Sequence, residues 1–118
     1  MPPIAARLLP ILMLLCSNVF MTFAWYGHLR FKDRPLWLVI PISWGIAFLE
    51  YCLAVPANRW GSAVYTPAEL KAMQEVITLM VFAGFSAFWL GQRPTAGMLA
   101  GFALIAAGAF LVFREAAR

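Results

Sequence analysis

The chain has 118 residues, of which 64% are hydrophobic and only 12% are charged. A water-soluble domain of this size cannot bury so much apolar surface, because small domains have a large surface relative to their volume. The formal net charge of +4 comes from basic residues at the boundaries of apolar segments. We interpret these residues as anchors to lipid headgroups and expect a lipid bilayer, with no nucleic acid, as the partner.

The first apolar segment predicts a membrane-spanning helix over residues 8–29. A helix needs about 20 mostly apolar residues to cross a hydrocarbon core of about 30 Å. The segment ends in Trp25, Tyr26 and His28, side chains that favour the membrane–water boundary. Arg7 ahead of it gives a faint likeness to a signal peptide, but no small-residue cleavage site follows, so we expect the span to be retained.

A second span is predicted over residues 35–56, closing at a proline, and a loop over residues 57–66. Cys16 and Cys52 fall inside the first two spans, where thiols behave as small apolar groups and meet few oxidants. Both cysteines are therefore expected to be free thiols.

The third span, over residues 67–90, is weakly apolar at its start and must begin early to cross the bilayer. Thr66 as N-cap, Pro67 at the first helical position and Glu69 at the positive end of the helix dipole predict that start. A fourth span is predicted over residues 96–113. The expected fold is a single all-α transmembrane domain, over residues 1–118, that forms an integral membrane bundle of four helices.

The orientation of such a bundle depends on the basic residues at its two ends. Five lie at one end and four at the other, which is a weak bias towards cytoplasmic termini. The alternative is dual insertion, in which oppositely oriented copies pair as an antiparallel dimer. The two sets are Arg7, Arg59, Lys71, Arg114 and Arg118 against Arg30, Lys32, Arg34 and Arg93.

Glu50 is a candidate functional residue because a carboxyl group inside a membrane is costly. At helical spacing it shares a small, polar face with Ser43, Ala47 and Ala54, which is expected to point into protein. Apolar surroundings disfavour the charged form, so Glu50 is expected to exchange a proton, as proton-coupled transport requires. The structural alternative is a tie to another helix through Asn18 or Arg59.

Glu75 shares a helical face with Lys71, Thr78 and Phe82, which together form a stripe with a polar start and aromatic walls. This stripe could line a path for a substrate. In the alternative interpretation Lys71 neutralises Glu75 as a local ion pair, and the carboxylate is structural.

Asn18, Thr22 and Trp25 occupy one face of the first span. They are candidates for contact with a ligand. The alternative is that Asn18 forms a hydrogen bond to a neighbouring helix, the common role of such residues in membranes.

Gly97 and Gly101 form a GxxxG step on the fourth span, and Gly108 continues nearly the same side. Small residues allow close helix packing, so we expect a contact there, either within the monomer or between copies. The sequence holds one histidine and lacks a phosphate-binding loop or a spaced nucleophile and base. We therefore expect no enzyme, no catalytic residues, no metal site and no cofactor.

The sequence also resembles known membrane proteins. Residues 88–95 (FWLGQRPT) and 101–108 are similar to the third helix, turn and glycine-bearing last helix of small multidrug resistance-like four-helix proteins, within the drug/metabolite transporter superfamily. Residues 18–28, 56–59 and 70–78 resemble a small bacterial family of unknown function in that superfamily. The resemblance implies a transporter whose last helix is a dimer contact.

One position departs from the multidrug pattern. Those exporters have a glutamate in the first helix that binds proton and drug in competition, and Asn18 stands in its place. Any proton coupling must then fall to Glu50 or Glu75; the alternatives are a uniporter or a non-transporting subunit.

Taken together, these features predict a small homodimeric transporter of the bacterial inner membrane for a small metabolite or cation. The alternative is a non-transporting structural or accessory membrane subunit. The expected path residues are Asn18, Thr22, Trp25, Glu50, Glu75 and Thr78.

Overall fold

The computed structural model describes residues 3–116, and over that range the chain forms helices and no strands. Four helices are each long and apolar enough to cross a membrane, which confirms the expected all-α, four-helix class. They are α1 (Pro3–Tyr26), α2 (Leu36–Gly61), α3 (Pro67–Phe88) and α4 (Ala96–Ala116), and the short 3-10 helix η1 (Gly27–Arg30) follows α1.

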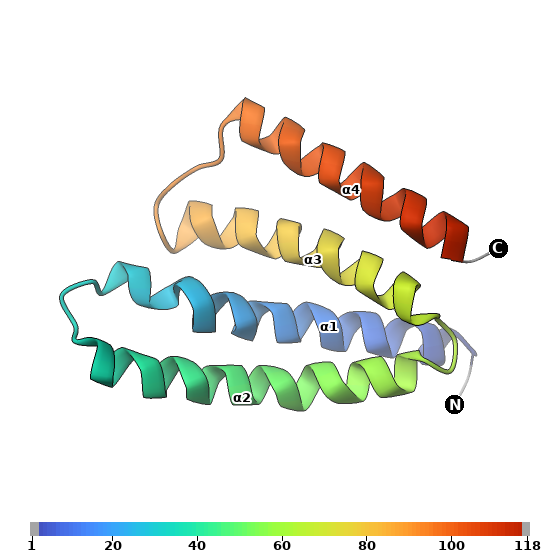
Figure 1. Cartoon of the computed structure of the whole chain (residues 1–118), viewed down its shortest axis with the longest axis horizontal. Helices are drawn as coiled ribbons and strands as arrows, with labels where there is room; N and C mark the ends of the chain where they lie inside the picture. The colour runs from blue at the N-terminus through green and yellow to red at the C-terminus, as the bar shows by residue number, and fades with distance from the viewer. Residues whose placement is uncertain (1–2, 117–118) are drawn as a thin grey trace.

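The helices lie in the spatial order α2, α1, α3, α4, and each runs antiparallel to the one before it in the chain (Figure 1). The connections over residues 31–35 and 89–95 share one end of the bundle, which we call the loop end. The connection over residues 62–66 lies with both chain termini at the opposite end, which we call the terminal end. A chain that crosses a membrane in this way has both termini on the same side.

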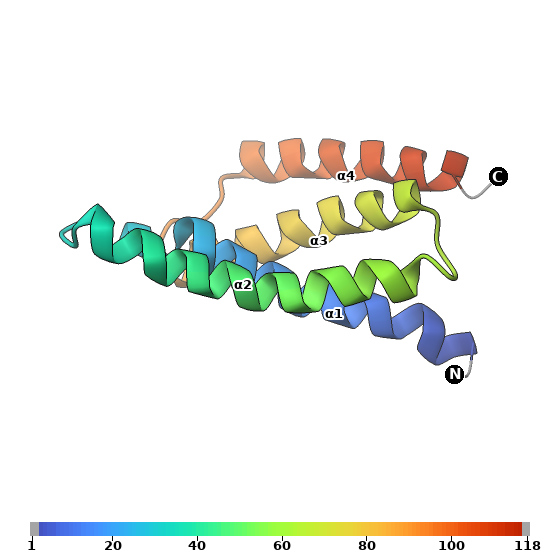
Figure 2. The same cartoon turned by 60° about the horizontal axis from the view of Figure 1, so that its bottom comes forward.

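The outer helix α4 is the least enclosed part of the bundle. α1 packs against both α2 and α3, whereas α4 packs mainly against α3 and contributes no buried residue within its described length. The bundle measures 49 × 34 × 19 Å along its three principal axes, so one dimension is much shorter than the other two. This flat shape leaves α4 with a broad face that no other helix of the chain covers (Figure 2).

α2 continues to Gly61, so the expected end at Pro56 and the loop expected from residue 57 are wrong. Proline removes one backbone donor, and a membrane helix tolerates it where its neighbours compensate. The helix persists because Ala57 and Gly61 are both buried against neighbouring helices. Other ends also shift, since α1 begins at Pro3 rather than residue 8, α3 ends at Phe88 rather than 90, and α4 ends at Ala116 rather than 113.

The start of α3 confirms the predicted cap. The Thr66 hydroxyl accepts from the Glu69 backbone N–H at 3.2 Å, and the Glu69 carboxylate accepts from the Thr66 N–H at 2.9 Å. This reciprocal pair is a capping box, with Pro67 at the first helical position. It defines the start of α3 directly after the connection from α2.

Three helices meet closely at the terminal end. Leu14, Ala57 and Leu70 form a buried core cluster from α1, α2 and α3. A Cβ at Gly61 would lie 2.9 Å from Leu70 Cδ2 and 3.2 Å from Pro10 Cβ. Only glycine fits this approach without displacing its neighbours.

Aromatic side chains join the helices at the loop end. The Phe23 ring lies 5.0 Å from the Phe85 ring and 4.9 Å from the Trp89 ring, centroid to centroid. The Trp89 indole N–H donates to the Gly27 carbonyl at 3.1 Å, and the Arg30 guanidinium lies 4.7 Å from the centre of the Trp89 ring. These contacts attach the end of α3 to the end of α1.

Candidate functional site

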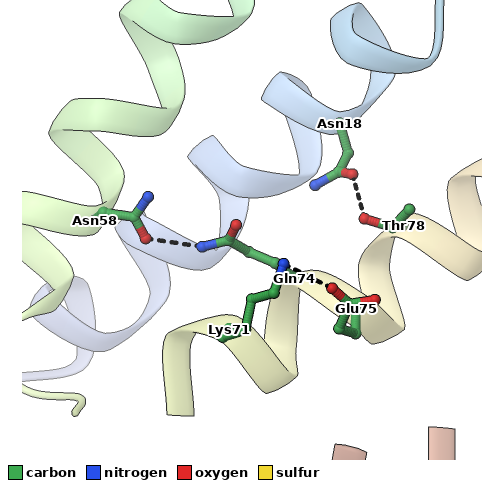
Figure 3. A network of polar contacts seen from close by, with 6 residues as sticks. All are labelled: Asn18, Asn58, Lys71, Gln74, Glu75 and Thr78. Carbon is green, nitrogen blue, oxygen red and sulfur yellow. Dashed lines mark hydrogen bonds and ion pairs between the residues drawn. The ribbon is translucent and has the colours of Figure 1, made fainter. Parts of the chain in front are cut away.

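Asn18 is a buried polar residue of α1, 8% exposed, and it connects two helices. Its side-chain oxygen accepts from the Thr78 hydroxyl of α3 at 2.6 Å (Figure 3). Its amide nitrogen donates to the Leu14 carbonyl one turn earlier at 3.0 Å. The side-chain oxygen and the side-chain nitrogen of Asn18 are therefore both hydrogen-bonded. This agrees with the alternative interpretation of Asn18, in which it forms a hydrogen bond to a neighbouring helix.

Thr22 lies one turn after Asn18 and is also buried. Its hydroxyl donates to the Asn18 carbonyl oxygen at 2.7 Å, a local bond that keeps the group satisfied inside an apolar helix. The structure thus brings together three of the predicted site residues, Asn18, Thr22 and Thr78.

Glu50 is 8% exposed and lies on the buried face of α2, seven residues before Ala57 and eleven before Gly61. That face packs on the antiparallel helix α1, where Leu14 shares a core cluster with Ala57 and Pro10 lies against Gly61. The two pairs define one antiparallel register, because a step of four residues along α1, from Pro10 to Leu14, corresponds to a step of four residues back along α2, from Gly61 to Ala57.

The same register places Glu50 opposite residue 21 of α1, in the turn that joins Asn18 to Thr22. Glu50 is the fifteenth of the 26 residues of α2, so this depth is near the middle of the helix. Among residues 3–116, no hydrogen bond or ion pair to its carboxyl group is found. We call Asn18, Thr22, Glu50 and Thr78 the central polar layer.

Asn58 and Gln74 form a second polar connection that the sequence analysis missed. The Gln74 amide nitrogen donates to the Asn58 side-chain oxygen at 2.8 Å and joins α3 to α2 (Figure 3). The sequence analysis expects a loop over residues 57–66, so helical spacing could not be used to predict a partner for Asn58. Extending α2 past Pro56 would have placed Asn58 on a helix and made the pair a candidate.

Glu75 and Trp25 are not brought into the central polar layer. The Glu75 carboxylate pairs with the Lys71 ammonium at 2.8 Å, one turn away on the same helix, and their side chains are 45% and 73% exposed. This is the local ion pair expected under the structural interpretation of Glu75. Trp25 is 64% exposed on the outside of α1.

The glycines of α4 make no close contact within the described chain. A Cβ at Gly101 or Gly108 would meet nothing within 4 Å, and one at Gly97 would meet only the Thr95 hydroxyl at 3.9 Å. They are therefore not used in packing α4 on α3, and the contact between copies stays a prediction. Both cysteines are free thiols, as predicted.

The family of the chain follows from its sequence over nearly its whole length. Residues 10–113 match the family model described as "Putative member of DMT superfamily (DUF486)". The chain belongs to this family. Searches with this chain match no curated protein and no solved structure. Family membership and the four apolar helices together identify a multi-pass membrane protein of the drug/metabolite transporter superfamily whose function is unknown.

In this DUF486 chain, the matched region includes every residue of the central polar layer and all three α4 glycines. The layer holds two hydroxyls, one amide and one carboxyl group near the middle of the apolar helices; Asn18, Thr22 and Glu50 are buried, and Thr78 lies at the exposed edge of the layer. Such a set can bind a small polar or cationic group, and its carboxyl can exchange a proton.

Proposed function

We propose that the protein is a small transporter of the bacterial inner membrane that acts as a homodimer and moves a small metabolite or cation through the central polar layer. Glu50 is the ionisable group of the path. Asn18, Thr22 and Thr78 supply the hydroxyl and amide groups beside it.

The observation that carries the proposal is the position of Glu50. A carboxyl group that is 8% exposed near the middle of an apolar helix is costly, and residues 3–116 offer it no hydrogen bond or ion pair. A group that only stabilised the bundle would be expected to have a partner. Its lack of one in the described chain favours a substrate or a proton as the partner.

Glu75 and Trp25 belong to the proposed path only where a second copy covers them, because both are exposed in the single chain. Glu75 lies between the terminal end and the layer, on the same helix as Thr78, and would attract cationic substrates only once its ion pair with Lys71 opens.

Flux into vesicles tests the proposal. We would reconstitute the purified protein, screen the uptake of small metabolites and organic cations with and without a proton gradient, and compare variants on any substrate found. Glu50→Gln is expected to lower the initial rate by about tenfold or more, because glutamine cannot carry a proton. Flux that is unchanged by Glu50→Gln and Glu75→Gln together would refute the assigned roles.

Glu69→Gln is the matched control. It removes a carboxylate from α3, but glutamine also completes a capping box, so helix and flux are expected to persist. A similar loss of flux in this variant would show that the assay responds to any lost acidic group.

A structural or accessory membrane subunit is the second candidate function. The bonds from Asn18 to Thr78 and from Gln74 to Asn58 favour it, because interhelical bonding is the usual role of such groups in membranes. Stability in detergent separates the two candidates. A Glu50→Gln variant that unfolds or loses its oligomer supports the structural role, whereas one that stays intact but loses flux supports the transporter.

A further inference from the structure

A groove with a volume of about 350 Å³ opens at the loop end. One wall is formed by the end of α1 together with η1, and the other by the first half of α2. Phe23 and Gly27 line the first wall, and Trp89, at the end of α3, also lines the groove. The ring contact between Phe23 and Trp89 and the Trp89 bond to Gly27 hold these residues together. The groove is therefore a built feature, separate from the central polar layer.

The α2 side of the groove is an apolar stripe. Leu38, Ile42 and Ile46 follow one another at four-residue spacing and all line the groove. At a rise of about 1.5 Å per residue, this stripe runs about 12 Å from the start of α2 towards the middle of the helix. Its length and direction match an extended hydrocarbon chain, whereas a soluble ion would leave the stripe without apolar contact.

The opening of the groove is basic. Arg34 and His28 both line it, at the level where the helices end and lipid headgroups begin. Within residues 3–116, no ion pair to Arg34 is found. One acidic residue, Asp33, lies among the further cations of the loop end, which are Arg30, Lys32 and Arg93.

We propose that this groove is a binding site for one anionic bilayer phospholipid, whose acyl chain lies along the α2 stripe and whose phosphate is bound by Arg34. The apolar stripe accounts for the chain, and the unpaired cation at its outer end accounts for the negative headgroup. The site requires neither transport nor a dimer, so it stands or falls independently of the proposed function.

Contact quenching of Trp89 tests the site, because this indole lines the groove. The same indole also lines a second hollow with Thr22 and Phe85, so the readout is the excess quenching by the anionic lipid over the neutral one. Trp25, Trp37, Trp44 and Trp60 are all exposed, so replacing each with Phe leaves Trp89 as the sole tryptophan of a folded chain. The variant is reconstituted in phosphatidylcholine vesicles that contain chain-brominated phosphatidylglycerol or chain-brominated phosphatidylcholine. We expect phosphatidylglycerol to quench Trp89 more strongly at equal mole fraction, and equal quenching would overturn the proposal.

Arg34→Gln is expected to reduce this preference by about fivefold, the factor for one basic side chain near an anionic surface. Arg59→Gln is the matched control, because it removes an exposed arginine from the last turn of α2, at the terminal end and away from the groove. A preference that survives Arg34→Gln, or that Arg59→Gln removes equally, would overturn the assignment of the phosphate to Arg34.

Two further measurements test the groove itself and the source of the phosphate. Ser43→Phe fills the groove and is expected to remove the excess quenching by phosphatidylglycerol, while circular dichroism confirms the helices. An excess that persists in this variant, or competition by free glycerol phosphate, would overturn the bound-lipid proposal. Native mass spectrometry of the unaltered chain, which should retain phosphatidylglycerol over phosphatidylcholine, gives the same comparison without any tryptophan replacement.

Discussion

Asn18 and Glu50 lie at similar depth in the bundle but differ in their bonding. The Asn18 amide is bonded on both sides, to Leu14 and to Thr78, whereas no bond to the Glu50 carboxyl is found within residues 3–116. A satisfied polar group holds two helices together, and an unsatisfied one has capacity for a ligand or a proton. The two residues therefore have different expected roles, although both are polar residues in apolar helices.

A double-mutant cycle measures the bond between Asn18 and Thr78. We expect Asn18→Ala and Thr78→Val to show a coupling of about 0.6 kcal/mol in the free energy of unfolding in mixed detergent, because membrane interhelical hydrogen bonds average this value and reach about 1.7 kcal/mol at most. Asn18→Ala with Gln74→Ala is the control, since these residues belong to separate bonds and should act additively. Additive effects in the first pair would contradict the bond.

At the scale of the element, α2 and α3 show where local rules hold and where they fail. The capping box of Thr66 and Glu69 is complete within four residues, so the sequence could predict the start of α3. The rule that proline interrupts a helix is also local, and it predicts that α2 ends at Pro56. That prediction is wrong because Ala57 and Gly61 pack against other helices. Tertiary burial outweighed the loss of one backbone donor.

Removing the cap should weaken the start of α3. Thr66→Ala is expected to lower the free energy of unfolding by about 1 kcal/mol, because the Glu69 N–H loses its acceptor. Hydrogen exchange at residues 67–70 should accelerate in the same variant. Thr66→Ser keeps the hydroxyl and should retain most of the stability, so an equal loss in both variants would assign the effect to the lost methyl group.

At the scale of the whole molecule, the unpaired face of α4 is the main feature that the single chain leaves open. None of the residues described in α4 is buried, and Gly101 and Gly108 have open space around them. Small residues that are not used within the chain are suited to close packing with a second copy. This arrangement supports the proposed dimer.

Replacing these glycines tests the dimer. We expect Gly101→Leu combined with Gly108→Leu to shift the protein from dimer to monomer in detergent, because the larger side chains keep the backbones apart. Gly45→Leu is the matched control, since Gly45 also has open space around it but lies on α2. Molecular mass from light scattering reads the outcome. A dimer that persists in the double variant would place the contact elsewhere, and a monomeric unaltered chain would exclude the dimer.

The sequence by itself determined that lipid surrounds most of the chain, that the fold is all-α with four membrane-spanning helices, and much of the local structure. An apolar fraction of 64% requires lipid, the lengths of the apolar runs require four helices, and Thr66 to Glu69 determine where α3 begins. Only the tertiary structure decided that Asn18 bonds Thr78, that Glu50 is buried at a similar depth, and that the α4 glycines stay open. These features depend on the register between helices, and that register is set by packing among residues 60 or more positions apart, such as Asn18 with Thr78 and Phe23 with Trp89.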